Sequence, residues 1–186
     1  MMDAYDLPTS LEIGGVGFPI RYGWRAVIDI LSAFSDPDLD DWGKQEVMLK
    51  VLYPDWEQIP PEYIPEALQK ACDFIDCGQK DDGKPRPRTY DWDQDALIII
   101  PEINKVANTE VRLTPELHWW TFFSYFMGIG DGTFASVVAI RQKKAKHKKL
   151  EKWEETFYRE NRALVDLKTH DSEEVRAEKE NITKWL

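Results

Sequence analysis

Four carboxylates near the middle of the chain have the spacing of a calcium-binding loop. In the stretch DWDQDALIIIPE they occupy positions 1, 3, 5 and 12 of an EF-hand loop: Asp91, Asp93, Asp95 and Glu102. The loop's other requirements are not met, because position 6, which needs glycine, is Ala96 and position 9, which needs an oxygen ligand, is Ile99. The segment fits the start of a capped helix better, since the helix dipole favours carboxylates there. We therefore expect no metal site here.

Side chains that commonly perform catalysis are scattered along the chain. The three histidines, His118, His147 and His170, are isolated from one another, and His118 is predicted to be a partly buried structural residue or a contact with a partner. The G-x-S-x-G, H-E-x-x-H and Walker motifs do not occur. The glycines at positions 14, 15 and 17 miss the dinucleotide-binding spacing and are typical of a turn. We expect no enzyme and no cofactor, although a hydrolase using two carboxylates stays open as an alternative.

The charge of the chain limits its partners. A net charge of -10 over 186 residues argues against nucleic-acid binding, which needs a basic surface for phosphates. The charge is uneven, with 17 acidic and 6 basic residues in 1–83 against 17 acidic and 18 basic residues in 84–186. The stretch MMDAYDLPTS does not resemble a secretory signal, and the aromatic run 117–129 is too short for a bilayer, which takes about 20 apolar residues. We therefore expect no contact with nucleic acid or membrane.

The two cysteines, Cys72 and Cys77, lie five residues apart in a segment with helical periodicity. That spacing places them on different faces of a helix, so neither a disulfide nor a metal pair is favoured. They are predicted to be the reduced thiols of a cytoplasmic protein.

The elements that must position these residues are mostly helices. Residues 10–21 alternate around Gly14-Gly15, which predicts a β-hairpin. Apolar residues then recur with helical spacing, and the predicted helices are 24–34, a helix ending before Pro54, one opened by Pro60-Pro61 and regular from Pro65, one capped by Asp91 and Gln94 and kinked or split by Pro101, one from Thr114-Pro115 to Gly128, and a long segment from about Thr133. The fold class is mainly α, a helical domain with a short N-terminal β-hairpin.

Composition divides the chain into four parts. They are an acidic hairpin-plus-helices region (1–77), a linker rich in glycine, proline and charge (78–89), an aromatic helical region (90–146), and an amphipathic C-terminal helix with a charged tail (147–186). The basic run RQKKAKHKK (141–149) is predicted to be a solvated helical face or to contact an acidic protein surface, for instance on a neighbouring copy.

The stretch HWWTFFSYF contains six aromatic rings in nine residues. On a helix these rings cover almost the whole circumference, so the helix must be surrounded by its own core or by a partner. Tryptophan and tyrosine at the edge of a core are good binding anchors. Both interpretations stay open, and the candidate partner-binding residues are Trp119, Trp120, Tyr125, Trp153 and Phe157.

Several patterns together resemble the Gp15-like proteins of long-tailed bacteriophages. The segments TYDWDQDA and LHWWTFF follow the family's pattern, and SLEIGGVGFPIRYGWRAVIDIL is similar to its N-terminal part. The resemblance covers about residues 9–145 and includes Asp91, Gln94, Asp95, His118, Trp119 and Arg141. Pro101 departs from the pattern.

The resemblance implies a non-enzymatic role in tail morphogenesis. It implies a tail assembly chaperone in the host bacterial cytoplasm that binds apolar helices of unassembled tape measure or tail tube proteins. Self-association is a further expected contact, which the basic run and the C-terminal segment suggest. The alternative is a permanent structural component of the virion tail. The segment 147–186 lies beyond the resemblance, and we expect it to dock as a separate amphipathic element on a partner or on another copy, with the basic run facing an acidic surface.

Overall fold

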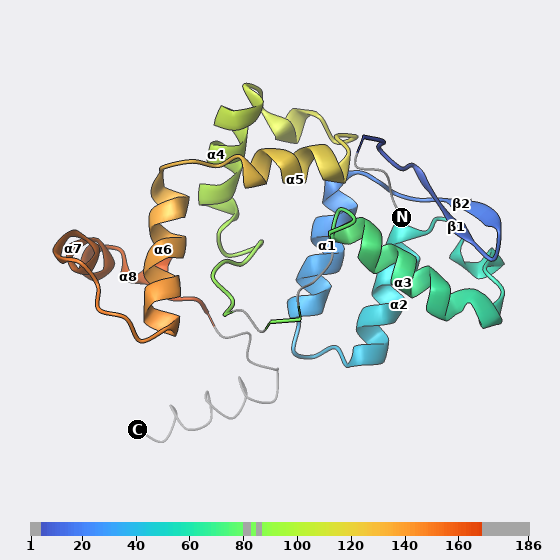
Figure 1. Cartoon of the computed structure of the whole chain (residues 1–186), viewed down its shortest axis with the longest axis horizontal. Helices are drawn as coiled ribbons and strands as arrows, with labels where there is room; N and C mark the ends of the chain where they lie inside the picture. Colours follow the sequence, from blue (N-terminus) through green and yellow to red (C-terminus); the bar gives the residue numbers. More distant parts are fainter. Residues whose placement is uncertain (1–4, 80–82, 85–86, 169–186) are drawn as a thin grey trace, which may run out of the picture. The chain divides into compact units, whose positions relative to one another are not determined.

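The computed structural model describes residues 5–79, 83–84 and 87–168. These residues form two compact units, one within residues 1–79 and one within residues 80–168, and the division between them falls inside the segment 78–89. Within the described residues the fold is mainly α, with eight α-helices and a single two-stranded sheet (Figure 1).

The first unit begins with the predicted hairpin. Strand β1 (Ser10–Ile13) pairs antiparallel with β2 (Val16–Pro19), and Ile13 lies opposite Val16. Gly14 and Gly15, which join the strands, have φ values of 56° and 80°, a left-handed conformation that glycine adopts without strain. A Cβ on Gly14 would also lie 2.8 Å from the ring of Tyr63. The turn therefore needs glycine for its conformation and for the close approach of Tyr63.

Three helices complete the first unit: α1 (Trp24–Ser35), α2 (Asp41–Leu52) and α3 (Ile64–Ile75), with two 3-10 turns between α2 and α3 (Trp56–Gln58 and Pro61–Tyr63). Helix α2 packs against both α1 and α3. Asp40 caps α2 by accepting a hydrogen bond from the Gly43 amide at 2.7 Å, and Pro65 lies in the first turn of α3, as predicted. Their shared core includes Val27, Ile30, Leu52, Ala67, Ala71 and Phe74, all fully buried.

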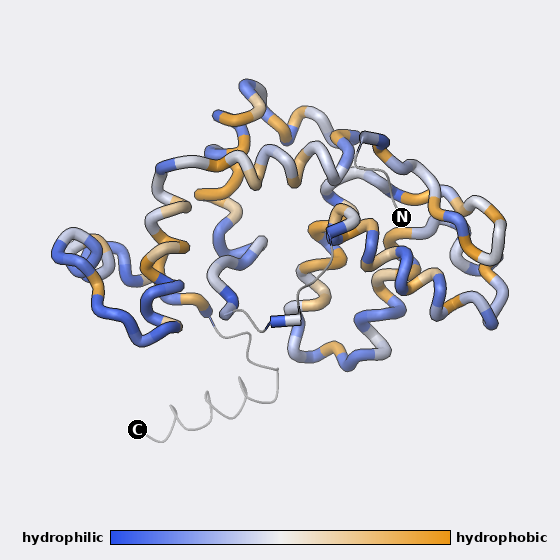
Figure 2. Tube along the Cα trace, viewed as in Figure 1, coloured by the Kyte–Doolittle hydropathy of each residue, from blue (hydrophilic) through white to orange (hydrophobic). Residues whose placement is uncertain are grey.

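The second unit is entirely helical in its described residues. It contains α4 (Ala96–Ala107), α5 (Trp119–Met127), α6 (Thr133–Ala145), α7 (Lys152–Glu160) and α8 (Arg162–Val165), with a 3-10 turn at Val111–Leu113. Helix α4 packs against α5 and α6, while α7 and α8 lie on α6 (Figure 1). The tube in Figure 2 shows apolar residues along α6 and a hydrophilic connection from α6 to α7.

Two predicted helix starts are wrong. The helix predicted from Asp91 begins only at Ala96, because the Asp91 side chain accepts hydrogen bonds from the amides of Asp93 and Gln94 in a preceding turn. The helix predicted from Thr114-Pro115 begins at Trp119. Its cap is His118, whose Nδ1 accepts a hydrogen bond from the Trp120 amide at 3.1 Å.

Pro101 does not split α4, which runs continuously through it. Proline removes the amide that would bond to the carbonyl four residues earlier, that of Leu97. Leu97 lies at the surface and is 87% exposed, and α4 continues past the missing hydrogen bond. The helix therefore tolerates the proline at this position.

Among the residues that the structure describes, none of the helices combines the length and the apolar composition that crossing a membrane requires.

Candidate partner-binding site

The aromatic helix α5 belongs to the core of the second unit. Trp119 is 1% exposed and Phe122 is fully buried. The ring of Trp92 lies 6.0 Å from that of Trp119 and 4.7 Å from that of Phe126, in tilted and edge-on contacts typical of packed aromatic residues. Trp120 is also buried. The core interpretation of the stretch is therefore the one that the structure favours, and neither tryptophan presents an exposed anchor.

The other three predicted partner-binding residues differ in exposure. Tyr125 is partly buried on α5. Trp153 on α7 is 52% exposed, and its indole N–H donates to Glu151 at 3.1 Å. Phe157, one turn further along α7, packs against a small apolar cluster of Val137, Ile140 and Val165. Of the five residues, Trp153 has the side chain most open to a partner.

The structure corrects the prediction for the C-terminal segment. Leu150, Phe157 and Leu164 are not free to dock on a partner. They pack against the cluster that contains Val137 and Ile140 of α6 in the same chain. Helices α7 and α8 therefore belong to the second unit up to residue 168. Residues 169–186 lie outside the described residues, so the prediction for them has no structural counterpart.

The basic run faces acidic residues of its own chain in part. Lys143 lies 2.7 Å from Glu154, and Lys144 lies 2.5 Å from Asp166. The hydrogen bond to Glu154 is the main cause that raises the pKa of Lys143. These ion pairs hold α7 and α8 on α6, which is the physical reason why a basic run does not keep the segment away from the core.

Arg141 at the start of that run is the centre of a buried polar cluster. Its guanidinium makes two hydrogen bonds to the Asp95 carboxylate, at 2.5 and 2.9 Å, and both side chains are almost fully buried. It also donates to the carbonyls of Val165 (2.7 Å), Leu164 (2.9 Å) and Thr89 (3.2 Å). One side chain thereby joins three segments of the second unit.

Gln94 makes a second connection to the same C-terminal segment. Its side-chain amide donates to the Asp166 carbonyl and accepts from the Lys168 amide, both at 2.9 Å. The residues that carry the sequence resemblance thus all have structural roles. Asp91 stabilises a turn, His118 caps a helix and Trp119 belongs to the core. Gln94, Asp95 and Arg141 attach residues 164–168 to the unit.

Three of the four carboxylates with calcium-like spacing form ion pairs with basic side chains of the chain. Asp91 forms an ion pair with Arg88, Asp95 with Arg141, and Glu102 with Lys105 at 2.9 Å. In the described part of the chain no group of three His, Cys, Asp or Glu side chains is placed to hold a metal ion. The spacing in the sequence therefore reflects these ion pairs and the turn before α4.

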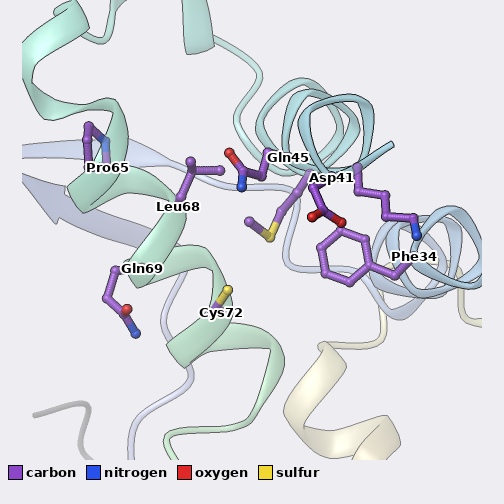
Figure 3. A pocket seen from close by; sticks show the side chains of 9 residues that line it. Phe34, Asp41, Gln45, Pro65, Leu68, Gln69 and Cys72 are labelled. Carbon is purple, nitrogen blue, oxygen red and sulfur yellow. The ribbon is translucent and has the colours of Figure 1, made fainter. Parts of the chain in front are cut away.

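The first unit carries an open groove between α2 and α3, which we call the α2–α3 groove. It has a volume of about 560 Å³, and nine residues line it: Phe34, Asp41, Lys44, Gln45, Met48, Pro65, Leu68, Gln69 and Cys72. The lining positions follow one pattern, since each helix contributes residues i, i+3, i+4 and i+7, which lie on one helix face. Figure 3 shows Leu68 of α3 and Gln45 of α2 pointing toward one another, with Phe34 of α1 beside Asp41.

The groove is apolar at its floor and polar at its rim. Met48 is buried, Leu68 and Cys72 are partly buried, and Gln45 and Gln69 are exposed. Burial, followed by the nearby carboxylates of Asp76 and Asp73, raises the pKa of the Cys72 thiol. A thiol that stays protonated at neutral pH is a poor nucleophile. The lining therefore offers a partly apolar surface with polar side chains along its edges.

The sequence did not identify this groove. The periodicity marked Met48, Leu68 and Cys72 as apolar helix positions, and most residues with that signal are buried in a core. Only the packing of α1, α2 and α3 shows that these faces are left partly uncovered. The signal that could have found it is the matching i, i+3, i+4, i+7 sets on two neighbouring helices, each mixing apolar and polar side chains.

Comparison with known proteins gives one result. No curated protein and no solved structure matched the chain. The family model described as "Bacteriophage Gp15 protein" matches residues 4–167, which extends the resemblance seen in the sequence through α7 and α8. The match covers nearly all of the residues that the structure describes, and its end coincides with the last residues attached by Arg141 and Gln94. The chain therefore belongs to the bacteriophage Gp15 protein family.

Proposed function

We propose that this protein is a non-enzymatic tail assembly chaperone that binds apolar helices of unassembled tail proteins, such as the tape measure protein or tail tube subunits. The observation that carries the proposal is the open α2–α3 groove in a member of a bacteriophage protein family. Binding an amphipathic helix in a groove between two helices is a common mode of peptide recognition. The second unit supports this role as a packed scaffold whose family-typical residues serve the fold.

The mechanism is mass action. A chaperone that binds the unassembled form of a tail protein lowers the concentration of free apolar helices, and therefore the rate of their aggregation. At a chaperone concentration of about 100 times the dissociation constant, the bound form is stabilised by about 2.7 kcal/mol. The complex must still dissociate when the tail assembles, so moderate affinity suits the role better than very tight binding.

The site of action is the host bacterial cytoplasm, where tail proteins are assembled. The alternative is that the chain remains in the particle as a structural component of the virion tail. Nucleic acid and membrane are not partners in this proposal, in keeping with the net charge of -10.

The proposal is tested by co-expression. The tape measure and tail tube proteins of the same phage are expressed with and without this chain, and their soluble fractions are compared. We expect a severalfold larger soluble fraction with the chain and a complex that co-purifies. Mass spectrometry of purified phage particles then separates the two roles, because a chaperone is absent from them and a tail component is present in fixed stoichiometry. Unchanged solubility of both tail proteins refutes the chaperone.

A further inference from the structure

We propose that the α2–α3 groove selects a basic amphipathic helix, with apolar residues that enter the groove and lysine or arginine on both flanks. This inference rests on the proposed function and names the chemistry of the partner. Three observations carry it: the length of the groove, the charge around it, and the use that the chain already makes of its own basic helix.

The length of the groove fits about two turns of a helix. The lining residues of α2 run from Asp41 to Met48 and those of α3 from Pro65 to Cys72, which is seven residues of rise along each helix, or about 10 Å. A partner helix lying along the groove can therefore place apolar residues at i, i+3, i+4 and i+7 against the floor. Pro65 and Leu68 provide the apolar wall on one side, and Met48 provides the floor.

The charge around the groove is acidic. The loop between α1 and α2 and the first residue of α2 carry four aspartates in six residues, at positions 36, 38, 40 and 41, and Asp41 itself lines the groove. On the α3 side, Asp73 and Asp76 lie close enough to Cys72 to act on its thiol. Lys44 is the one basic residue in the lining. Over residues 5–79 there are 14 acidic and 5 basic residues, so the whole unit attracts a cation-flanked partner.

A second copy of the chain does not provide this partner from its described helices. The most basic of these helices is α6, and its apolar residues Val137 and Ile140 are fully buried in its own unit. Two of its lysines, Lys143 and Lys144, already pair with acidic residues of α7 and of the segment after α8. Docking α6 in the groove of another copy would require the second unit to open. We therefore assign the groove to a helix of another protein, and docking of a second copy is an outcome of the test below.

The test uses two synthetic peptides with a fluorescent label and the full-length chain. Both peptides have about 18 residues, enough for helix formation in a bound state, and identical leucines at i, i+3, i+4 and i+7. One carries lysines on its flanks and the other carries glutamates at the same positions. Fluorescence anisotropy measures binding at about 0.1 M and about 1 M salt, between which the Debye length falls from about 10 Å to about 3 Å.

We expect the basic peptide to bind at least about tenfold more tightly than the acidic one at the lower salt concentration. Each exposed ion pair changes affinity by about 1.5- to 5-fold, so several pairs together give this ratio. The ratio should fall toward one at high salt. Equal binding of the two peptides at low salt overturns the inference.

Variants locate the binding. Leu68→Glu places a charge in the apolar wall and should weaken the basic peptide at least tenfold, whereas Leu97→Glu, at an exposed leucine of the second unit, should leave binding unchanged. The double reversal Asp73→Lys/Asp76→Lys should weaken the basic peptide about tenfold at low salt. Its matched control, Glu12→Lys/Glu57→Lys, changes the net charge equally at exposed positions outside the groove lining and should have a smaller effect. Circular dichroism confirms that each variant is folded.

The same variants distinguish this inference from the proposed function. If the wild-type chain keeps a tail protein soluble in co-expression and Leu68→Glu does so equally well, the proposed chaperone function is supported. The groove is then not its binding site, and the inference is overturned. If the chain keeps neither tail protein soluble but binds the basic peptide in the groove, the groove is a basic-helix site with a different partner. Self-association that is abolished by Leu68→Glu, without peptide binding, assigns the groove to a second copy and overturns the inference.

Discussion

Replacing Arg141 by methionine removes the centre of the buried cluster in the second unit while keeping an unbranched apolar stem. The variant loses both hydrogen bonds to Asp95 and the bonds to the carbonyls of Val165, Leu164 and Thr89. The Asp95 carboxylate is fully buried, and the hydrogen bond that it keeps among the described residues comes from the Asp91 amide at 2.9 Å.

The expected loss follows from what is left behind. Removing one partner of a buried ion pair costs about 3–5 kcal/mol, because the remaining charge stays buried without compensation. The carbonyls of Leu164 and Val165 also lose a donor, although water can reach part of this segment once it moves. We therefore expect the free energy of unfolding of this unit to fall by at least about 4 kcal/mol. This is a large part of the roughly 5–15 kcal/mol that holds a domain of ordinary stability folded.

Urea denaturation and hydrogen exchange measured by mass spectrometry test this loss of free energy of unfolding in the second unit. Peptides from residues 87–168 should exchange much faster in Arg141→Met, and those from the first unit should not change. Arg112→Met is the control, because Arg112 pairs with Glu110 at the surface, and such pairs contribute about 0–1 kcal/mol. A loss below about 1 kcal/mol in Arg141→Met would falsify the view that this cluster holds the unit together.

Four further outcomes are expected. Phe122→Ala should lower the free energy of unfolding by about 3–5 kcal/mol in urea denaturation, since the ring is fully buried; a near-neutral result contradicts the core assignment of α5. Burial raises the pKa of Glu154, but hydrogen bonds from Lys143 and the backbone, and the charge of Lys143, lower it overall below 4.5. Thermal stability should therefore be lost as the pH falls below that value, and Glu154→Gln should flatten this part of the curve. Deleting residues 147–186 should unfold the second unit by circular dichroism, because α6 loses its apolar cover; a truncated chain with unchanged helical signal per residue contradicts this. Millimolar calcium should leave the melting temperature unchanged, because three of the four carboxylates with calcium-like spacing are held in ion pairs, and a rise of several degrees refutes that.

Local features of the fold were predictable from the sequence. The Gly14-Gly15 hairpin, Pro65 in the first turn of α3 and the end of α5 before Gly128 each depend on the conformational preferences of one or two residues. The mainly α fold class followed from the periodicity of apolar residues. These predictions are confirmed because their causes act within a few residues along the chain.

Features that depend on distant residues were not predictable. Arg141 and Asp95 are 46 residues apart, and Gln94 reaches Asp166 over 72 residues, so no local pattern reveals that they meet. The return of α7 and α8 to α6 was predicted wrongly for the same reason. A basic run is typical of a solvated surface until its acidic partners, here Glu154 and Asp166, are placed beside it.

The candidate site shows the same limit. The aromatic stretch was a visible signal in the sequence, and packing turned Trp119 and Trp120 into core residues. The α2–α3 groove gave no distinct signal, because a groove is a place where packing is incomplete. Which helix faces stay uncovered depends on the angles and spacings of whole helices, and the apolar pattern of a single helix does not contain that information.

The attachment of residues 164–168 has a consequence for synthesis on the ribosome. The described part of the first unit is continuous in sequence, so its groove can form once residue 79 has emerged. The second unit cannot be completed until residues 164–168 are synthesised, because Arg141 and Gln94 bind the backbone of these residues. The 72 residues between Gln94 and Asp166 take about 4–14 s to translate at roughly 5–20 residues per second. A nascent chain is therefore expected to form its groove several seconds before its second unit is complete, and the partner helix proposed above would meet the groove during synthesis.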